Sequence, residues 1–360
     1  MRLRSLSAVV TLIASLAWPF TASAFDQLHL PAEREPVAPL VIHAALDLPY
    51  VRPLLEDFHR RNPQYDITYR NFATLELDER FLAAPDEADL MISSAMPWQY
   101  RLANDGYAQA VDTPVTRRWP AEAKWRQELF AFSFEPVIMV INRAVIERYG
   151  PVDSHADLLD LLRRHGDELR GKVVTYDPVA SGAGYTYAIE ESRLSPQYWD
   201  LIAALGHADA ALVNTTGAMM EGLKDGRYLI GYNLLGSYVR QDIDAHPDLE
   251  WRIPDDYALV IQRLAFVPRQ APHPINAKHF LDYLLSVNGQ GILAKEGHLG
   301  ALHPELDGPG TANALYRLRP EGLRPTPLGP GLLTTLDDLK RRALLSRWQR
   351  EFSGPQTLFP

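Results

Sequence analysis

The order of patterns along the chain predicts an α/β fold with two doubly wound lobes. Short apolar runs rich in β-branched residues alternate with segments of helical apolar spacing, as expected for parallel strands joined by helices. A chain of 360 residues also exceeds the size at which a single hydrophobic core stops growing. We therefore expect two lobes, and the sequence shows no internal repeat or low-complexity segment.

The N-terminus has the pattern of a secretory signal peptide. Arg2 and Arg4 precede an apolar run over 8–18, and residues 22–24 supply the small side chains of a cleavage site. We expect cleavage after Ala24 and a mature protein in the periplasm. The apolar run is short for a membrane span, and an uncleaved anchor is the alternative.

Composition argues against several classes of function. Of the 36 Lys and Arg residues, 34 remain after the two N-terminal arginines are removed, against 45 acidic residues, which gives a formal charge of −11. A protein this acidic is poorly suited to nucleic acid, so we expect no nucleic-acid partner. The absence of cysteine excludes disulfides, cysteine nucleophiles and thiolate metal sites.

The first lobe is predicted from three strand–helix units in succession. Residues 25–39 are rich in proline and charge, and we expect an arm without regular structure there. The expected strands then cover 40–45, 65–70 and 88–93, and the expected helices cover 51–61 and 74–81. Successive units of this kind predict a parallel sheet whose strand ends lie along one edge.

A long apolar strand over 132–141 leads into the second lobe, which repeats the scheme. Its expected strands cover 173–176, 211–213 and 228–232, and its expected helices cover 143–149, 158–170, 185–192, 195–204 and 219–224. A second long strand over 257–266 crosses back, and helices over 277–285, 289–294 and 332–352 follow. The predicted domains are a signal peptide (1–24), an arm (25–39), lobe 1 (40–135 and 258–330), lobe 2 (136–257) and a C-terminal helix and tail (331–360).

The stretch 171–190, GKVVTYDPVASGAGYTYAIE, joins a strand to a helix through a Ser-Gly-x-Gly turn. Pro178 ends the strand because proline has no N–H and restricts the residue before it. A hydroxyl and two glycines at a helix start leave backbone N–H groups uncrowded, and the helix dipole adds partial positive charge. These features suit an anion. An ordinary capped helix with flexible glycines fits the same residues, so the motif alone leaves both interpretations open.

The sequence carries no recognisable catalytic motif. The eleven histidines are scattered, and the G-x-S-x-G elbow, the Walker loop and a G-x-G-x-x-G after the first strand are all missing. Asp255 and Asp256 follow a proline, and we interpret them as solvated charges in a turn. We therefore expect a binding protein and not an enzyme, with no catalytic residue, no cofactor and no metal.

The candidate ligand-binding residues are neutral or acidic side chains and glycines near strand ends, in loops that face each other across the two lobes. Such a ring binds through many hydrogen bonds and through desolvation on closure. The candidates are Asp47, Thr74, Ser93, Ser94, Ser181, Gly182, Gly184, Tyr185, Thr215, Tyr232, Asn233 and Ser237.

Three segments resemble the solute-binding proteins of ABC importers. Residues 271–290, which include APHP and AKHFLDYLLS, resemble the late helix of that family, in the branch that includes ferric-iron and phosphorylated-sugar binders. Residues 171–187 resemble its Ser-Gly-x-Gly-Tyr turn, and residues 225–238 (DGRYLIGYNLLGSY) its following strand and loop. The resemblance covers 40–300. It implies a fold like the type II periplasmic binding proteins, with a two-strand hinge and a ligand enclosed between the lobes.

The resemblance leaves the ligand and the partner open. Iron binders of the family use two adjacent tyrosines in a loop like the one at Tyr232, whereas Tyr232 is followed here by Asn233. We therefore expect a small organic anion, a phosphate ester or a carboxylate, with ferric iron or a neutral ligand as alternatives. The family implies delivery to an ABC permease, or presentation of the ligand to a sensor kinase at the inner membrane. We expect a monomer.

Overall fold

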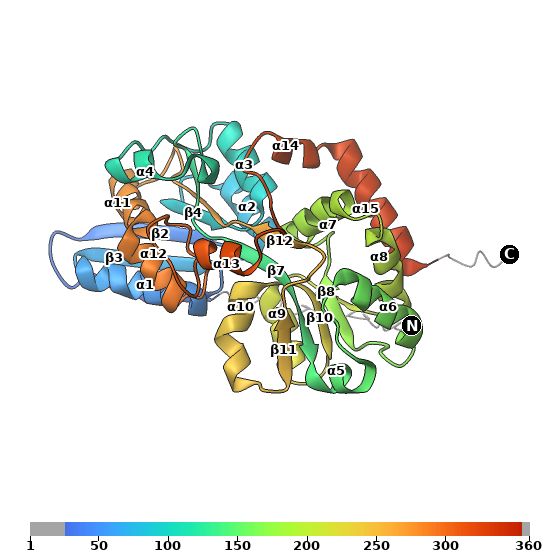
Figure 1. The fold of residues 1–360 in the computed structure, drawn as a ribbon. Helices are drawn as coiled ribbons and strands as arrows, with labels where there is room; N and C mark the ends of the chain where they lie inside the picture. The colour runs from blue at the N-terminus through green and yellow to red at the C-terminus, as the bar shows by residue number, and fades with distance from the viewer. Residues whose placement is uncertain (1–25, 355–360) are drawn as a thin grey trace, which may run out of the picture.

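The computed structural model describes residues 26–354, which form two lobes that are each built on a seven-stranded sheet flanked by helices (Figure 1). The sheet of lobe 1 has the order β1-β3-β2-β4-β13-β6-β5. The sheet of lobe 2 has the order β14-β12-β7-β10-β8-β9, and β11 pairs with β7. The predicted signal peptide lies outside the described residues. None of the helices in 26–354 is long and apolar enough to cross a membrane.

Lobe 1 draws its elements from both ends of the chain. Its strands are β1 (Gln27–Leu30), β2 (Ala38–Ala44), β3 (Tyr65–Asn71), β4 (Leu90–Ser93), β5 (Lys124–Trp125), β6 (Leu129–Ala131) and β13 (Leu264–Phe266). Its helices are α1 (Leu48–Arg61), α2 (Thr74–Ala83), α3 (Met96–Asn104), α4 (Pro114–Arg118), η1 (Ala121–Ala123), α11 (Pro274–Leu285) and α12 (Val287–Lys295).

Lobe 2 is nearly continuous in sequence. Its strands are β7 (Glu135–Asn142), β8 (Val173–Tyr176), β9 (Ala211–Val213), β10 (Ile230–Leu235), β11 (Leu249–Arg252), β12 (Ala258–Ile261) and β14 (Leu323–Pro325). Its helices are α5 (Arg143–Tyr149), α6 (His155–His165), α7 (Gly182–Leu194), α8 (Tyr198–His207), α9 (Thr216–Lys224), α10 (Gly236–Asp242) and η2 (Ile243–Ala245). The chain continues through α13 (Ala312–Leu318), α14 (Gly331–Thr335) and α15 (Asp338–Ser353).

The parallel strands predicted for lobe 1 are confirmed, because β2 pairs in parallel with both β3 and β4. The four residues of β4 are all buried, as expected for an inner strand covered on both faces. The prediction of an arm without regular structure is wrong over 27–30, where β1 pairs with β3. The composition of this proline-rich segment does not indicate that it adds an edge strand to the sheet.

The predicted strand over 257–266 is two strands, and the break is where the chain passes between the lobes. β12 pairs with β7 in lobe 2, and β13 pairs with β4 in lobe 1. β12 and β14 therefore belong to the second sheet, although both fall within 258–330, which the sequence assigned to lobe 1. The strand over 132–141 likewise begins later, at Glu135, after β6 has ended in lobe 1. The exact bounds of the lobes stay a prediction.

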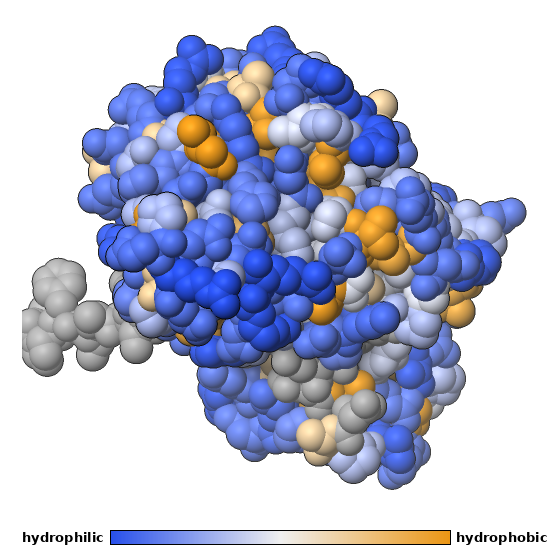
Figure 2. Space-filling model, turned by 90° about the vertical axis from the view of Figure 1, so that its left-hand side faces the viewer, coloured by the Kyte–Doolittle hydropathy of each residue, from blue (hydrophilic) through white to orange (hydrophobic). Residues whose placement is uncertain are grey.

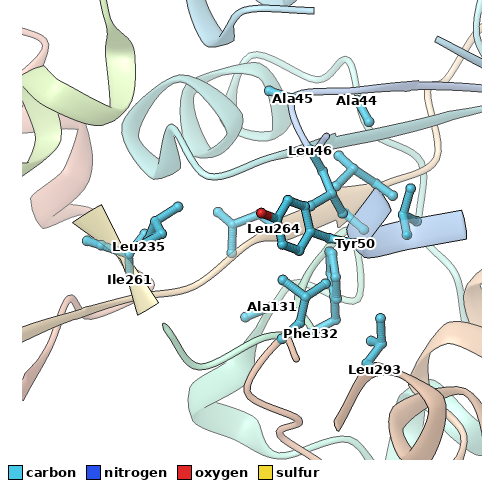
Figure 3. Close-up of a cluster of buried hydrophobic side chains, with 14 of the residues drawn as sticks. Ala44, Ala45, Leu46, Tyr50, Ala131, Phe132, Leu235, Ile261, Leu264 and Leu293 are labelled. Carbon is cyan, nitrogen blue, oxygen red and sulfur yellow. The ribbon is translucent and has the colours of Figure 1, made fainter. Parts of the chain in front are cut away.

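The hydrophobic core is continuous across the join between the lobes. Figure 3 shows part of it, where Leu235 of β10 and Ile261 of β12 lie in the same buried cluster as Tyr50 of α1 and Leu264 of β13. The surface in Figure 2 is mainly hydrophilic, with hydrophobic residues in small separate spots. Burial of apolar surface is thus concentrated within the lobes and at their contact.

The C-terminal segment is two helices and not the single predicted one. α14 packs on α3 of lobe 1, and α15 packs along α8 of lobe 2, so that the segment crosses from one lobe to the other (Figure 1). Asp337 begins α15 by accepting a hydrogen bond from the N–H of Lys340, which gives the second helix its own cap. Residues 331–353 therefore span both lobes.

Candidate functional site

A small cavity lies between the lobes, where the ends of strands and the starts of helices meet. The space left between its walls is about 30 Å³, room for on the order of one water molecule. The lining residues come from both lobes: Ala45, Asp47, Phe72, Ala73, Thr74, Ser94, Tyr176, Ala183, Asn214, Thr215, Thr216, Leu235, Tyr238 and Arg263.

Four helices begin at this cavity. Asp47 and Ala73 precede the first residues of α1 and α2 in lobe 1, and Thr215 precedes α9 in lobe 2. Ala183 lies in the first turn of α7. A helix start carries backbone N–H groups and the positive end of the helix dipole. Some of these N–H groups, those of Gly182, Gly184 and Ala218, are bonded to hydroxyls of the protein in this closed form. The cavity is therefore electrostatically suited to negative charge without a lysine in its lining.

Hydrogen bonds across the cavity hold the two lobes together. The N–H of Gly182 in lobe 2 donates to Thr74 Oγ1 in lobe 1 over 3.0 Å. On another side of the cavity, Tyr50 donates its hydroxyl to the carbonyl of Tyr238 over 3.2 Å, and the Asp47 N–H donates to the Tyr238 hydroxyl over 3.3 Å. The lobes are thus closed on each other in this structure.

Arg263 lines the cavity but its charge is already paired. Its Nε donates to Glu135 Oε1 over 2.8 Å, and its Nη1 donates to the carbonyl of Ala45 over 2.9 Å. Burial alone would lower the pKa of Arg263, but the charge of Glu135 raises it, so the guanidinium stays ionised. The Ser237 hydroxyl donates to the second oxygen of Glu135. The side chains of Arg263 and Glu135 are each 1% exposed. The pair lies where the chain crosses between the sheets.

The acidic groups of the cavity, the Asp47 carboxyl and the two phenols, have raised pKa values and are shifted toward their neutral forms. Burial raises the pKa of Asp47, although hydrogen bonds from Asn71 and Tyr238 and the charge of Arg263 oppose the rise. Burial also raises the pKa of Tyr176 to about 12, and burial together with Asp47 raises that of Tyr238. Both phenols are therefore protonated donors near neutral pH.

Of the predicted residues, Asp47, Thr74, Ser94 and Thr215 line the cavity. Gly182 lies next to it through its bond to Thr74. These residues come from separate loops of both lobes. The structure thus brings together part of the predicted ring.

Ser93, Ser181 and Gly184 serve the local backbone and do not line the cavity. Ser93 Oγ accepts the N–H of Ala95 over 3.1 Å, and Ser181 Oγ caps α7 by accepting the N–H of Gly184 over 3.2 Å. A β-carbon on Gly184 would lie 2.7 Å from the β-carbon of Tyr176, closer than packed atoms allow. The glycine is thus required by packing between β8 and α7. The Ser181 hydroxyl caps α7 in this structure, and its predicted ligand contact stays a prediction.

Tyr185 points away from the cavity toward the C-terminal segment. Its hydroxyl donates to the carbonyl of Thr335, and its ring meets that of Trp98 from lobe 1 edge-on at 5.5 Å. The guanidinium of Arg341 lies 5.6 Å from the Tyr185 ring. The aromatic pair therefore joins α3, α7 and the C-terminal segment.

Tyr232 and Asn233 belong to a polar cluster around Glu191 and do not line the cavity. Tyr232 donates to Glu191 Oε2 over 2.5 Å, and the Asn233 amide donates to the same oxygen over 3.0 Å. The other oxygen of Glu191 lies 3.4 Å from His155 Nε2, while His155 Nδ1 lies 2.8 Å from Asp256. Asp256 is therefore paired with the buried His155, although its own side chain is 33% exposed, so the prediction of a solvated charge without a partner is wrong only as to the partner. Since neither Tyr232 nor Asn233 lines the cavity, the predicted ligand contacts at these two residues stay a prediction.

Several residues that line the cavity were not predicted from the sequence. Each lies either next to a predicted residue or within an apolar strand. Thr216 adjoins Thr215, and it bonds the Tyr176 hydroxyl over 2.7 Å. Gln262 and Arg263 interrupt an otherwise apolar stretch, and this is the signal that could have identified Arg263. The missed polar residues are Tyr176, Asn214, Thr216, Tyr238 and Arg263.

A family model described as bacterial extracellular solute-binding protein matches residues 45–299. The chain belongs to this family. The solute-binding protein is 34% identical to the substrate-binding protein of an ABC transporter from Agrobacterium tumefaciens, whose crystal structure superposes with a TM-score of 0.88. The match covers 91% of this chain and 98% of that chain. The comparison with curated proteins gave no match.

Two more distant structures share the fold of this solute-binding protein. The periplasmic binding protein AfuA from Actinobacillus pleuropneumoniae, with bound fructose 6-phosphate, is 16% identical with a TM-score of 0.71, covering 88% of this chain and 98% of that chain. Iron-bound HitA from Pseudomonas aeruginosa is 15% identical with a TM-score of 0.68, covering 87% and 98%. The predicted two-lobed fold like the type II periplasmic binding proteins and the predicted family are confirmed. The family consists of transport components.

Proposed function

We propose that this solute-binding protein captures a small organic anion, a phosphate ester or a carboxylate, between its lobes and delivers it to an ABC importer. The observation that carries the proposal is the convergence of four helix starts on one cavity between the lobes. Helix starts bind anions through backbone N–H groups and the dipole. Hydroxyls of Thr74, Ser94, Thr215 and Thr216 add neutral donors around the same space.

The pairing of Arg263 supports recognition by dipoles and hydroxyls. Because Glu135 already neutralises the guanidinium, the lining offers no unpaired full positive charge. A site of this kind binds an anion without the strong attraction of an unpaired positive charge, so it can release the anion when the lobes open. Release is what delivery to a permease requires. In this closed form the cavity has a volume of only about 30 Å³, which is too small for such a ligand. A ligand therefore enters when the lobes separate.

The experiment is native mass spectrometry of protein purified from its host without refolding, followed by calorimetry with the released compound. We expect an adduct that leaves on denaturation, carries a phosphate or carboxylate group, and rebinds in the presence of EDTA. A neutral adduct, or rebinding only with added metal, would overturn the proposal.

Ferric iron is a second candidate because the cavity brings two phenols and a carboxylate together. Tyr176, Tyr238 and Asp47 all line it, although no two tyrosines are adjacent in sequence. Against iron, burial raises the pKa of both phenols, whereas a phenolate ligand must lose its proton. A visible charge-transfer band on adding ferric citrate, lost in Tyr176→Phe, would favour iron over the organic anion.

Two kinds of membrane protein could bind the ligand-bound form. Family membership favours an ABC permease in the inner membrane. We propose that the protein acts as a monomer in the periplasm. Presentation to a sensor kinase would use the same closed form. Cross-linking in intact cells, with and without the identified ligand, distinguishes the two by the partner recovered.

A further inference from the structure

Asp47 supplies the carboxylate that lines the cavity between the lobes. It stands between the end of β2 and the start of α1, and its Oδ1 accepts a hydrogen bond from Asn71 Nδ2 over 2.8 Å. Its Oδ2 reaches toward lobe 2, because a β-carbon on Gly217 in α9 would lie 2.9 Å from it. One side chain of lobe 1 thus extends to the first turn of a lobe 2 helix.

A carboxylate at this place is unexpected in a site suited to anions. The only guanidinium in the lining, that of Arg263, is committed to Glu135 and to the carbonyl of Ala45. Among Asp47, Arg263 and Glu135 the formal charge is therefore −1 when Asp47 is ionised. A second bare anion placed beside Asp47 meets like-charge repulsion in a buried space.

The carboxylate still has capacity to accept hydrogen bonds. Asn71 and Tyr238 occupy part of it, whereas an ionised carboxyl group has about four acceptor sites. A ligand that places a donor against Asp47 replaces repulsion with a charge-assisted hydrogen bond. Such a ligand matches both features of the cavity, because its anionic group meets the helix starts while its donor meets the carboxylate.

We infer that Asp47 is a specificity-determining residue that selects organic anions bearing a hydroxyl or ammonium donor near the charged group. The inference rests on the proposed function and narrows its ligand class. Asp47 repels simple anions of the same size. Anions that bear a donor instead form a hydrogen bond with it, between β2 and α9. A hydrogen bond to a charged group corresponds to roughly ten- to hundredfold in affinity.

The test compares matched probes by calorimetry. Methyl phosphate has no donor on its ester group, glycerol 3-phosphate adds hydroxyls, and phosphorylethanolamine adds an ammonium. Propionate, lactate and β-alanine form the same series for carboxylates. We expect at least one donor-bearing probe to bind the wild-type protein roughly tenfold or more tightly than its donor-free partner. The probe that binds more tightly shows whether Asp47 recognises a hydroxyl or an ammonium donor.

Two variants assign the gain to Asp47. Asp47→Ala should remove it for either donor, whereas Asp47→Asn should remove it for ammonium and keep part of it for hydroxyl, because the amide oxygen still accepts. Asp78→Asn is the matched control, since Asp78 is a buried carboxylate of lobe 1 that pairs with Arg101 outside the cavity. The control should retain the gain. Thermal unfolding of each variant verifies that it is folded.

The possible failures are distinct. If donor-free probes bind as tightly as the others, or if Asp47→Ala keeps the gain, Asp47 serves only its hydrogen bond with Asn71 within lobe 1, and the inference is wrong while the proposed function stands. If none of the phosphates or carboxylates binds, the proposed function fails and the inference with it.

Discussion

Arg263 and Glu135 form a buried ion pair, with Nε and Oε1 2.8 Å apart, at the place where the chain passes between the two sheets. Glu135 is the first residue of β7, and Arg263 lies between β12 and β13. The Arg263 N–H donates to the Ser133 hydroxyl, which itself donates to Glu135 over 2.7 Å. Both crossing segments are therefore tied to each other by charge and by hydrogen bonds.

Breaking this pair should cost far more than breaking a surface pair. Arg263→Met leaves Glu135 buried without its counter-charge, and we expect a loss of about 3–5 kcal/mol in the free energy of unfolding. Arg117→Met is the control, because Arg117 pairs with Asp112 on the surface and should cost less than about 1 kcal/mol. Urea denaturation measures both, and equal losses would contradict the prediction.

Gly184→Ala should destabilise the protein through packing. The added β-carbon would lie 2.7 Å from the β-carbon of Tyr176, so β8 and α7 must move apart, at a cost of about 1–3 kcal/mol. Gly291→Ala is the matched control, since Gly291 lies within α12 with nothing near its would-be β-carbon. The control should gain about 0.5–1 kcal/mol from helix propensity. Differential scanning calorimetry that finds both variants shifted in the same direction would refute this account.

Thr74→Val should favour opening of the lobes. The change removes the oxygen that accepts the Gly182 N–H, which is left without a partner in the closed form but is solvated in the open form. We expect a shift of about 1 kcal/mol or more toward the open form. Small-angle X-ray scattering of the unliganded protein should give a larger radius of gyration, and Thr74→Ser should restore the wild-type value. An unchanged scattering profile in Thr74→Val would exclude a role in closure.

His155 should make the stability fall at alkaline pH. Burial lowers its pKa, but hydrogen bonds from His155 to Asp256 and Glu191 outweigh it, and the pKa rises from 6.5 to about 9. The folded state therefore holds the proton more tightly than the unfolded state. The resulting stability is fully present below pH 6.5 and is lost as the pH rises through 9, by at most about 3 kcal/mol.

The measurement is urea denaturation at several pH values between 6 and 10. Wild-type stability should fall across that range, and His155→Gln should be less stable at pH 6 with a flatter profile above it. Parallel profiles for the two proteins would mean that other groups cause the fall. His165→Gln is a suitable control, because His165 pairs with Glu168 at a more exposed position.

The elements of the two sheets were predictable where apolar runs are bounded by turn residues, as in β2, β3 and β4. The crossing at Arg263 was not, because its partner Glu135 lies 128 positions away and only the fold brings them together. The surroundings of Tyr232 were not predictable for another reason. The pairing of β10 with β7 shifts between Tyr232 and Leu234, where Asn233 has a φ of 67°. A bulge interrupts the alternation of side chains along a strand, and the residue pattern of β10 does not predict it.

The position of β13 in the first sheet sets an order in which the two lobes can be completed. β13 lies between β4 and β6, so these strands are joined only after residue 266 is present. Lobe 2 lacks only its edge strand β14 by then, because β7 to β12 are consecutive. A chain that lengthens from its N-terminus thus holds an unfinished lobe 1, with β4 and β6 exposed along one edge, while lobe 2 assembles. The ion pair at Arg263 forms in the same stretch of growth and joins the second lobe to the first.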